Sequence, residues 1–225
     1  MSAYYQFAHS IDNAGALGSV AGVSAQNWQD LATEEGNSSS VPRQRVTGNY
    51  VYELPFGQDK HWATSGARSH IFEGFSVSGS FTFASGNYLS PGFEPSAQSV
   101  TCGNAGAVRP NLNPGISIAG PGTLHQWFNT AAFSEPSATA GYCNYFGSAP
   151  RNSIVGPGTV ENNMSLSKAM QLGDTRSMEL RAAINNVFNT VQYSGVDTSL
   201  NSPTFGQVTS AGGMRTFQFT ARFRF

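Results

Sequence analysis

The last ten residues of the chain, 216–225, alternate between polar and apolar side chains without a break. The polar positions include Arg222 and Arg224, and the aromatic positions are Phe217, Phe219, Phe223 and Phe225. Side chains of a β-strand project alternately to its two faces, so this segment predicts a strand with one aromatic and one polar face. Such a strand suits the wall of a membrane β-barrel or one sheet of a soluble β-sandwich.

The same alternation recurs along the chain and predicts six strands. Besides the last one, strands are expected at 46–54, 75–84 and 178–185, and with a weaker pattern at 3–9 and 164–172. Their lengths are close to the ~9–11 residues that a tilted strand needs to cross a bilayer. In the segment 164–172, Lys168 falls on the apolar face, where we expect it to extend toward the membrane interface or to mark a bulge.

The arginines of the last strand decide which face points inward. An unpaired charge in an apolar core is costly, so Arg222 and Arg224 should face a polar interior. There they are expected to pair with wall carboxylates such as Glu179, or to contact a plug. Period two then turns the aromatic residues outward, to lipid.

The connections between the expected strands alternate in length. Long connections span 10–44, 85–163 and 186–215, whereas the others span 55–74 and 173–177. Outer-membrane barrels have long extracellular loops and short periplasmic turns. The pattern therefore predicts an all-β fold, an antiparallel meander of about six transmembrane strands that forms an incomplete segment of a large outer-membrane barrel. The chain ends on the periplasmic side.

Composition restricts the function classes. Charged residues make up 11% of the chain and the formal net charge is −1, so nothing favours nucleic-acid binding. No Gly-x-Ser-x-Gly elbow occurs, and Gly156-Pro157-Gly158 lacks the Lys-Ser/Thr of a phosphate loop. The four histidines have no metal-ligand spacing. We therefore expect no enzyme activity, no catalytic residue, no metal and no cofactor.

The long connection 85–163 is rich in aromatic residues among Asn, Gly and Ser. They are either contacts for a sugar or peptide ligand or the small core of the loop itself, and the candidates are Trp127, Phe128, Phe133, Tyr142 and Tyr145. The same loop holds both cysteines of the chain, Cys102 and Cys143. In an oxidising compartment these two are expected to form a disulfide.

Several short motifs, in order along the chain, resemble a known family. They are RVTGNYVYELPFG at 45–57, APRNSIVGPG at 149–158, SLSK at 165–168, NNVFN at 185–189 and LNSPTFGQ at 200–207. Together they resemble the C-terminal barrel portion of TonB-dependent outer-membrane transporters of the Oar-like, acidobacterial type. The terminal FQFTARFRF is similar to the β-signal that the barrel-assembly machinery reads, with Phe217, Phe219, Phe223 and Phe225 as its aromatic positions.

The resemblance implies a location and partners. The family has a signal peptide, a plug and a barrel of about twenty-two strands, so residues 1–225 would be the C-terminal part of that barrel, in the cell outer membrane. Its partners would be lipid, the assembly machinery, the remaining barrel and the plug. TonB would act only through a missing N-terminal part. This chain opens directly in a strand and shows no signal peptide, which favours a fragment.

Two other interpretations stay open. One is a secreted β-sandwich that binds carbohydrate, in which the aromatic face would pack against a second sheet of the chain. The other is a passive porin or a surface adhesin with the same barrel wall.

Overall fold

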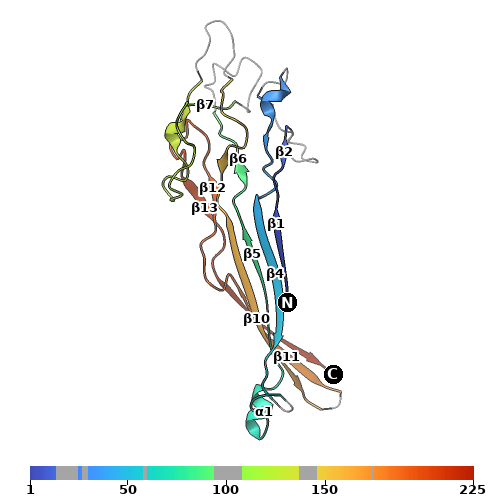
Figure 1. The fold of residues 1–225 in the computed structure, drawn as a ribbon. Helices are drawn as coiled ribbons and strands as arrows, with labels where there is room; N and C mark the ends of the chain where they lie inside the picture. Colours follow the sequence, from blue (N-terminus) through green and yellow to red (C-terminus); the bar gives the residue numbers. More distant parts are fainter. Residues whose placement is uncertain (14–24, 27–29, 58–59, 94–107, 137–145, 174) are drawn as a thin grey trace.

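A computed structural model describes residues 1–13, 25–26, 30–57, 60–93, 108–136, 146–173 and 175–225 (Figure 1). Its main feature is one sheet of six long strands: β1 (Ser2–Phe7), β4 (Gln44–Glu53), β5 (Phe75–Ala84), β10 (Thr159–Gln171), β11 (Ser177–Asn185) and β14 (Thr216–Arg224). Each strand pairs antiparallel with the long strand before it in the chain. The sheet is not closed, because β1 and β14 each have one neighbour. The predicted all-β meander is confirmed.

The register keeps the two faces of the sheet separate across all five pairings. Opposite residues lie on the same face, and apolar residues meet one another, as in Val46–Phe83 and Ile184–Phe217. Polar residues meet on the other face, where the Ser78 and Ser165 hydroxyls are 2.8 Å apart. A slip of one residue at any pairing would mix the faces, so the alternation fixes the register.

Two glycines make room for large rings on the aromatic face. A Cβ on Gly48 would lie 2.4 Å from the Phe81 ring, and a Cβ on Gly79 would lie 2.5 Å from the Tyr50 hydroxyl. Each ring therefore covers the glycine opposite it on the neighbouring strand, since the register pairs Gly48 with Phe81 and Tyr50 with Gly79. Cross-strand contacts of this kind pin the register of a sheet.

No second sheet covers the aromatic face in the described part of the chain. The other sheets there have two short strands each and belong to the loops. Large side chains on this face stay exposed, among them Tyr52, Leu166, Phe217, Phe219 and Phe223. The opposite face is hollowed, with one cavity of about 270 Å³ lined by Asn49, Ser78, Asn163, Ser165 and Arg181 among others. The β-sandwich interpretation is therefore wrong. Val51 is an exception to the pattern, an exposed apolar residue on the polar side.

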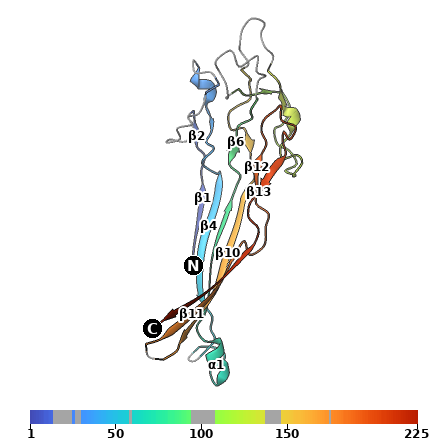
Figure 2. The ribbon, with the colours of Figure 1, turned by 180° about the vertical axis from the view of Figure 1, so that it is seen from behind.

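The long connections gather at one end of the sheet (Figures 1 and 2). Their described residues contain four small antiparallel two-stranded sheets: β2 (Ile11–Asp12) with β3 (Gly36–Asn37), β6 (Tyr88–Leu89) with β9 (Ile154–Val155), β7 (Asn111–Leu112) with β8 (Phe133–Ser134), and β12 (Tyr193–Val196) with β13 (Val208–Ala211). Two 3-10 turns, η1 (Leu31–Glu34) and η3 (Thr130–Ala132), also lie there. The C-terminus and the helix α1 (Ala67–Phe72) lie at the opposite end, as the alternation of connection lengths predicts.

One strand boundary differs by more than two residues from the expectation, and one connection has more structure than expected. The long loop predicted at 85–163 ends at 158, because β10 begins at Thr159. Asn162 falls on the apolar face and hides the alternation there, yet the ladder to Phe81 and Phe83 of β5 continues. The connection 55–74 is not a plain turn but contains α1. None of the helices in the described residues is long and apolar enough to cross a bilayer.

Lys168, the exception on the apolar face of β10, extends toward the end of the sheet. Its pairing with Phe75 and Leu180 is regular, so no bulge forms. The ammonium group lies 5.0 Å from the centre of the Phe75 ring and donates a hydrogen bond to the Ile71 carbonyl of α1. This is the first of the two expected arrangements.

Candidate functional site: the loop cap and the hollow beneath it

The loop cap, defined as the described residues of 8–43, 85–158 and 186–215, has its own small core. Buried in this core are Phe128, Ala132, Phe133, Ala149 and Ile154. We call the three ranges of the cap the first, second and third connections. Phe205, from the third connection, packs edge-on against Phe128 with ring centres 5.2 Å apart and against Phe133 at 6.1 Å. The second and third connections are therefore joined by aromatic packing.

For two of the five aromatic candidates, the core favours the second of the two interpretations, the small core of the loop itself. Phe128 and Phe133 expose only 2% and 5% of their surface, so their rings pack inside the cap and offer no face to a ligand. Trp127 lies at the edge of the core, and its indole N–H donates to the Val155 carbonyl at 2.8 Å. Tyr142 and Tyr145 lie outside the described residues, as do Cys102 and Cys143, whose disulfide stays a prediction.

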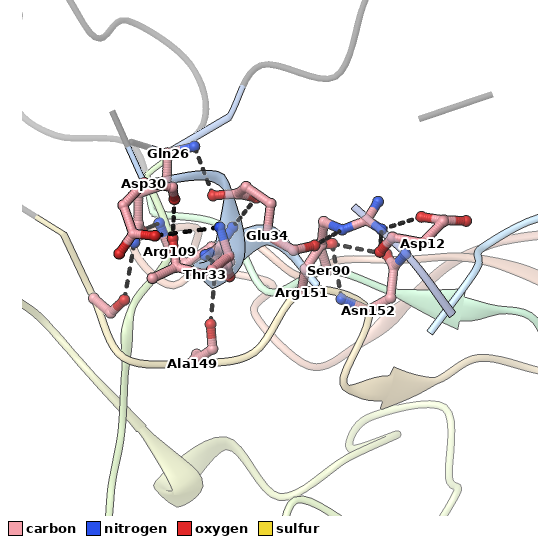
Figure 3. A network of polar contacts seen from close by, with 12 residues as sticks. Asp12, Gln26, Asp30, Thr33, Glu34, Ser90, Arg109, Ala149, Arg151 and Asn152 are labelled. Carbon is pink, nitrogen blue, oxygen red and sulfur yellow. Dashed lines mark hydrogen bonds and ion pairs between the residues drawn. The ribbon is translucent and has the colours of Figure 1, made fainter. Parts of the chain in front are cut away.

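A buried ion pair joins the first connection to the second (Figure 3). The Arg109 guanidinium donates to Glu34 Oε2 at 2.6 Å, and the two side chains expose 7% and 1% of their surface. Glu34 also accepts from the Gln26 backbone, while Arg109 donates to the Ala149 and Thr33 carbonyls. A buried ion pair is tolerated when its remaining hydrogen-bonding groups are satisfied, as here.

A second link lies beside the first and uses the motif at 149–158. Arg151 donates to the Glu34 carbonyl at 2.8 Å and forms an ion pair with Asp12 (Figure 3). Its hydrogen bond lowers the pKa of the Asp12 carboxyl from the ordinary value. Asn152, in the left-handed region at φ 53°, is bonded to Ser90 and donates to the Asn37 carbonyl. We call the contacts of Glu34, Arg109, Arg151 and Asn152 the staple.

The third connection is shaped around Asp197. Its carboxylate accepts from the Ser199 amide at 3.0 Å, from the Thr204 hydroxyl at 2.6 Å and from the Ser202 hydroxyl. Burial works against ionisation, but these hydrogen bonds outweigh it and lower the pKa of Asp197. The carboxylate thereby fixes Ser202 and Thr204, two residues of the motif at 200–207, in one turn.

A hollow of about 470 Å³ lies between the loop cap and the polar face of the sheet. The sheet contributes Arg45, Thr82 and Glu161, and the cap contributes Asn87 and Tyr193 among others. The hollow is therefore lined by one cation, Arg45, and one anion, Glu161, and neither is in an ion pair with another described residue. Its size and mixed polarity suit a small polar ligand.

Of the two predictions for the arginines of β14, the inward orientation agrees with the structure and the ion pair with Glu179 does not. Arg222 lies opposite Glu179 in the register, on the polar face, as expected. However, the ion pairs of the described residues do not include these two side chains.

Sequence reasoning missed the staple. Glu34 and Arg109 stand 75 residues apart, and neither belongs to a local pattern. Only the motif at 149–158 gave a signal, because it contains Arg151 and Asn152. The hollow was missed as well, since Arg45, Glu161 and Tyr193 come from three separate segments.

The model of the outer membrane beta barrel domain family matches residues 1–218. The chain belongs to this family. Together with the open antiparallel sheet and its exposed aromatic face, the match establishes an outer-membrane β-barrel protein, located in the outer membrane. Neither the comparison with curated proteins nor that with solved structures gives a match. The exposed aromatic face is thus the lipid face, and the loop cap lies at the extracellular end.

Proposed function

We propose that this barrel protein forms wall and extracellular loops of a TonB-dependent transporter of the Oar-like type. In this proposal residues 1–225 are the C-terminal part of a large barrel, and the cap and hollow receive an oligosaccharide or a short peptide for uptake. In this proposal the chain is not an enzyme, and the carboxylates of Asp12, Glu34 and Asp197 hold the loops.

The observation that carries the proposal is the pair of free edges. Strands β1 and β14 each have one neighbour, and six strands are fewer than the roughly eight of the smallest well-filled barrels. Lipid cannot satisfy unpaired backbone groups, so further strands must complete the wall. A large barrel with a wide interior is the kind that a plug fills. In the proposal, Arg222 and Arg224 on the polar face contact such a plug.

The hollow supports uptake of a polar ligand. A ligand entering from the extracellular end meets the cap first and the hollow next, where Arg45 and Glu161 can bind opposite charges or hydroxyl groups. The exposed part of Trp127, next to Tyr193 with ring centres 6.4 Å apart, adds an aromatic surface at this level. Assembly of the wall would use Phe217, Phe219, Phe223 and Phe225 of the last strand as the signal for the barrel-assembly machinery.

Uptake by cells that produce the full-length gene product tests this function. Labelled oligosaccharides and short peptides are offered with and without an uncoupler of the proton-motive force. Energised transport predicts accumulation that the uncoupler abolishes. Uptake that the uncoupler leaves unchanged supports a passive porin instead, and cell-surface binding without uptake supports an adhesin.

Substitutions in the hollow test whether the ligand binds there. Arg45→Gln and Glu161→Gln should each lower the affinity about tenfold or more, because a charge-assisted hydrogen bond contributes roughly 1.5–3 kcal/mol. Lys60→Gln serves as the matched control, since Lys60 is an exposed cation at the other end of the sheet. Equal affinity for all these proteins would remove the hollow from the proposal and leave the transport class untouched.

A further inference from the structure

The turn at the periplasmic end of the sheet carries an unusual group of exposed aromatic and aliphatic side chains. Trp62, Ile71 and Phe72 expose 57%, 56% and 47% of their surface. Phe56 holds the group together, with its ring centre 5.7 Å from Trp62 and 6.2 Å from Phe72. We call these four residues the aromatic turn. Exposed apolar groups of this kind mark a surface that contacts something other than water.

The position of the aromatic turn relative to the sheet identifies what covers it. Lys168 lies on the lipid face of β10, over the ring of Phe75, and its ammonium group is bonded to the Ile71 carbonyl of α1. The end of α1 is therefore bonded to a residue of the lipid face. The aromatic turn continues the lipid face beyond the strand ends, at the level of the headgroups.

The chemistry of the group fits a headgroup layer. Trp62 combines a large apolar surface with an N–H donor, which is why Trp is enriched at membrane interfaces. His61, next to the Trp62 ring at 5.5 Å, and Lys168 supply polar and cationic groups at the same place. A cation near the surface attracts lipid phosphates.

We infer that the aromatic turn is a membrane anchor that lies in the headgroup region of the periplasmic leaflet of the outer membrane. Its partner is a phospholipid surface. The anchor sets the depth of the wall in the bilayer at a point where a plain short turn would end in water. This inference rests on the outer-membrane location of the chain and not on the transport proposal.

Fluorescence of single tryptophans tests the anchor. The complete barrel, meaning residues 1–225 together with the strands that complete the wall, carries Trp28→Phe, Trp127→Phe and phenylalanine at any further tryptophan, so that only Trp62 remains. It is refolded into vesicles of phosphatidylethanolamine and phosphatidylglycerol whose acyl chains carry bromine either near the headgroups or near the bilayer centre. We expect several-fold stronger quenching of Trp62 by the shallow bromines than by the deep ones, and an emission maximum at shorter wavelength than that of hydrated tryptophan.

A reference variant separates the anchor from the wall. In the same background, Trp62→Phe with Phe219→Trp places the tryptophan on the lipid face of β14, where Phe219 is 78% exposed. If this tryptophan is quenched by lipid while Trp62 is quenched only by acrylamide in the water, the anchor is overturned and the aromatic turn must bind a periplasmic protein. If neither tryptophan is quenched by lipid, the lipid face itself is misassigned and the anchor falls with it.

Discussion

At the scale of single residues, the staple shows how much one buried ion pair carries. Glu34 has two carboxylate contacts and lies almost wholly inside the cap, whereas the ion pair of Lys60 with Glu53 is exposed on both sides. The two pairs offer a direct comparison between a buried and an exposed charge in one chain.

Replacing Glu34 by Gln should open the cap. The change leaves the Arg109 guanidinium buried without a counter-charge, a situation that typically costs about 3–5 kcal/mol. Hydrogen exchange of the amides in 108–112 and 146–152 should accelerate by two orders of magnitude or more. Glu53→Gln is the control and should change exchange by less than about fivefold, since an exposed pair contributes about 0–1 kcal/mol. Equal effects of the two variants would contradict the structural role of the staple.

Asp197 predicts a pH dependence for the third connection. Its pKa is lowered in the folded chain, so the carboxylate stabilises the turn fully above the unfolded pKa of 3.8 and loses this contribution as the pH falls through the lower folded value. Backbone NMR or hydrogen exchange of residues 197–207 should show loosening below about pH 4. In Asp197→Asn the turn should be looser at neutral pH and its acid transition absent. A turn equally ordered at pH 3 and pH 7 would contradict this.

At the scale of elements, the strands were predicted well because each carries its own alternation. The predicted range 75–84 is identical to β5. The predicted range 178–185 lacks only Ser177, the first residue of β11. By contrast, the start of β10 was missed, since Asn162 breaks the pattern and only pairing with β5 reveals the strand. The helix α1 was missed too, because six residues show no helical periodicity and its place depends on Lys168.

Glycine substitutions test the packing between β4 and β5. Gly48→Ala introduces a Cβ that meets both the Phe81 ring and the Ser2 carbonyl oxygen at 2.8 Å. The ring can turn away but the backbone cannot, so the sheet should lose about 1–3 kcal/mol, as is usual for overpacking. Gly213→Ala is the control, since nothing lies within 4 Å of its added Cβ. Urea unfolding from micelles measures the difference, and equal midpoints would contradict the ring-over-glycine contact.

At the scale of the whole molecule, the face pattern predicts dependence on a membrane mimic. Expressed without detergent, the chain should aggregate, because the lipid face exposes aromatic residues along four strands and both edges are free. A monodisperse monomer in plain buffer with a cooperative thermal transition would contradict the barrel-wall assignment.

The fold could be predicted from sequence but most of the candidate site could not, and the reason is the range of the interactions. A strand reveals itself through neighbouring residues, and the chain-order meander needs only short-range rules. The pairs Glu34–Arg109 and Asp12–Arg151 join segments that local periodicity never compares. The aromatic residues of the loop were recognised as a group, yet only the three-dimensional packing decides that Phe128 and Phe133 face inward.

The staple also has a consequence for the order in which the molecule matures. Arg151 and Asp12 are separated by 139 residues, with β4 and β5 between them, so their contact closes a very large loop of chain. Closure of so large a loop is entropically costly and slow until the intervening strands have paired. We therefore expect the cap to close last, so proteases added to intact cells should cut residues 30–43 in assembly intermediates but not in the completed barrel. Protease resistance of residues 30–43 then indicates that insertion is complete.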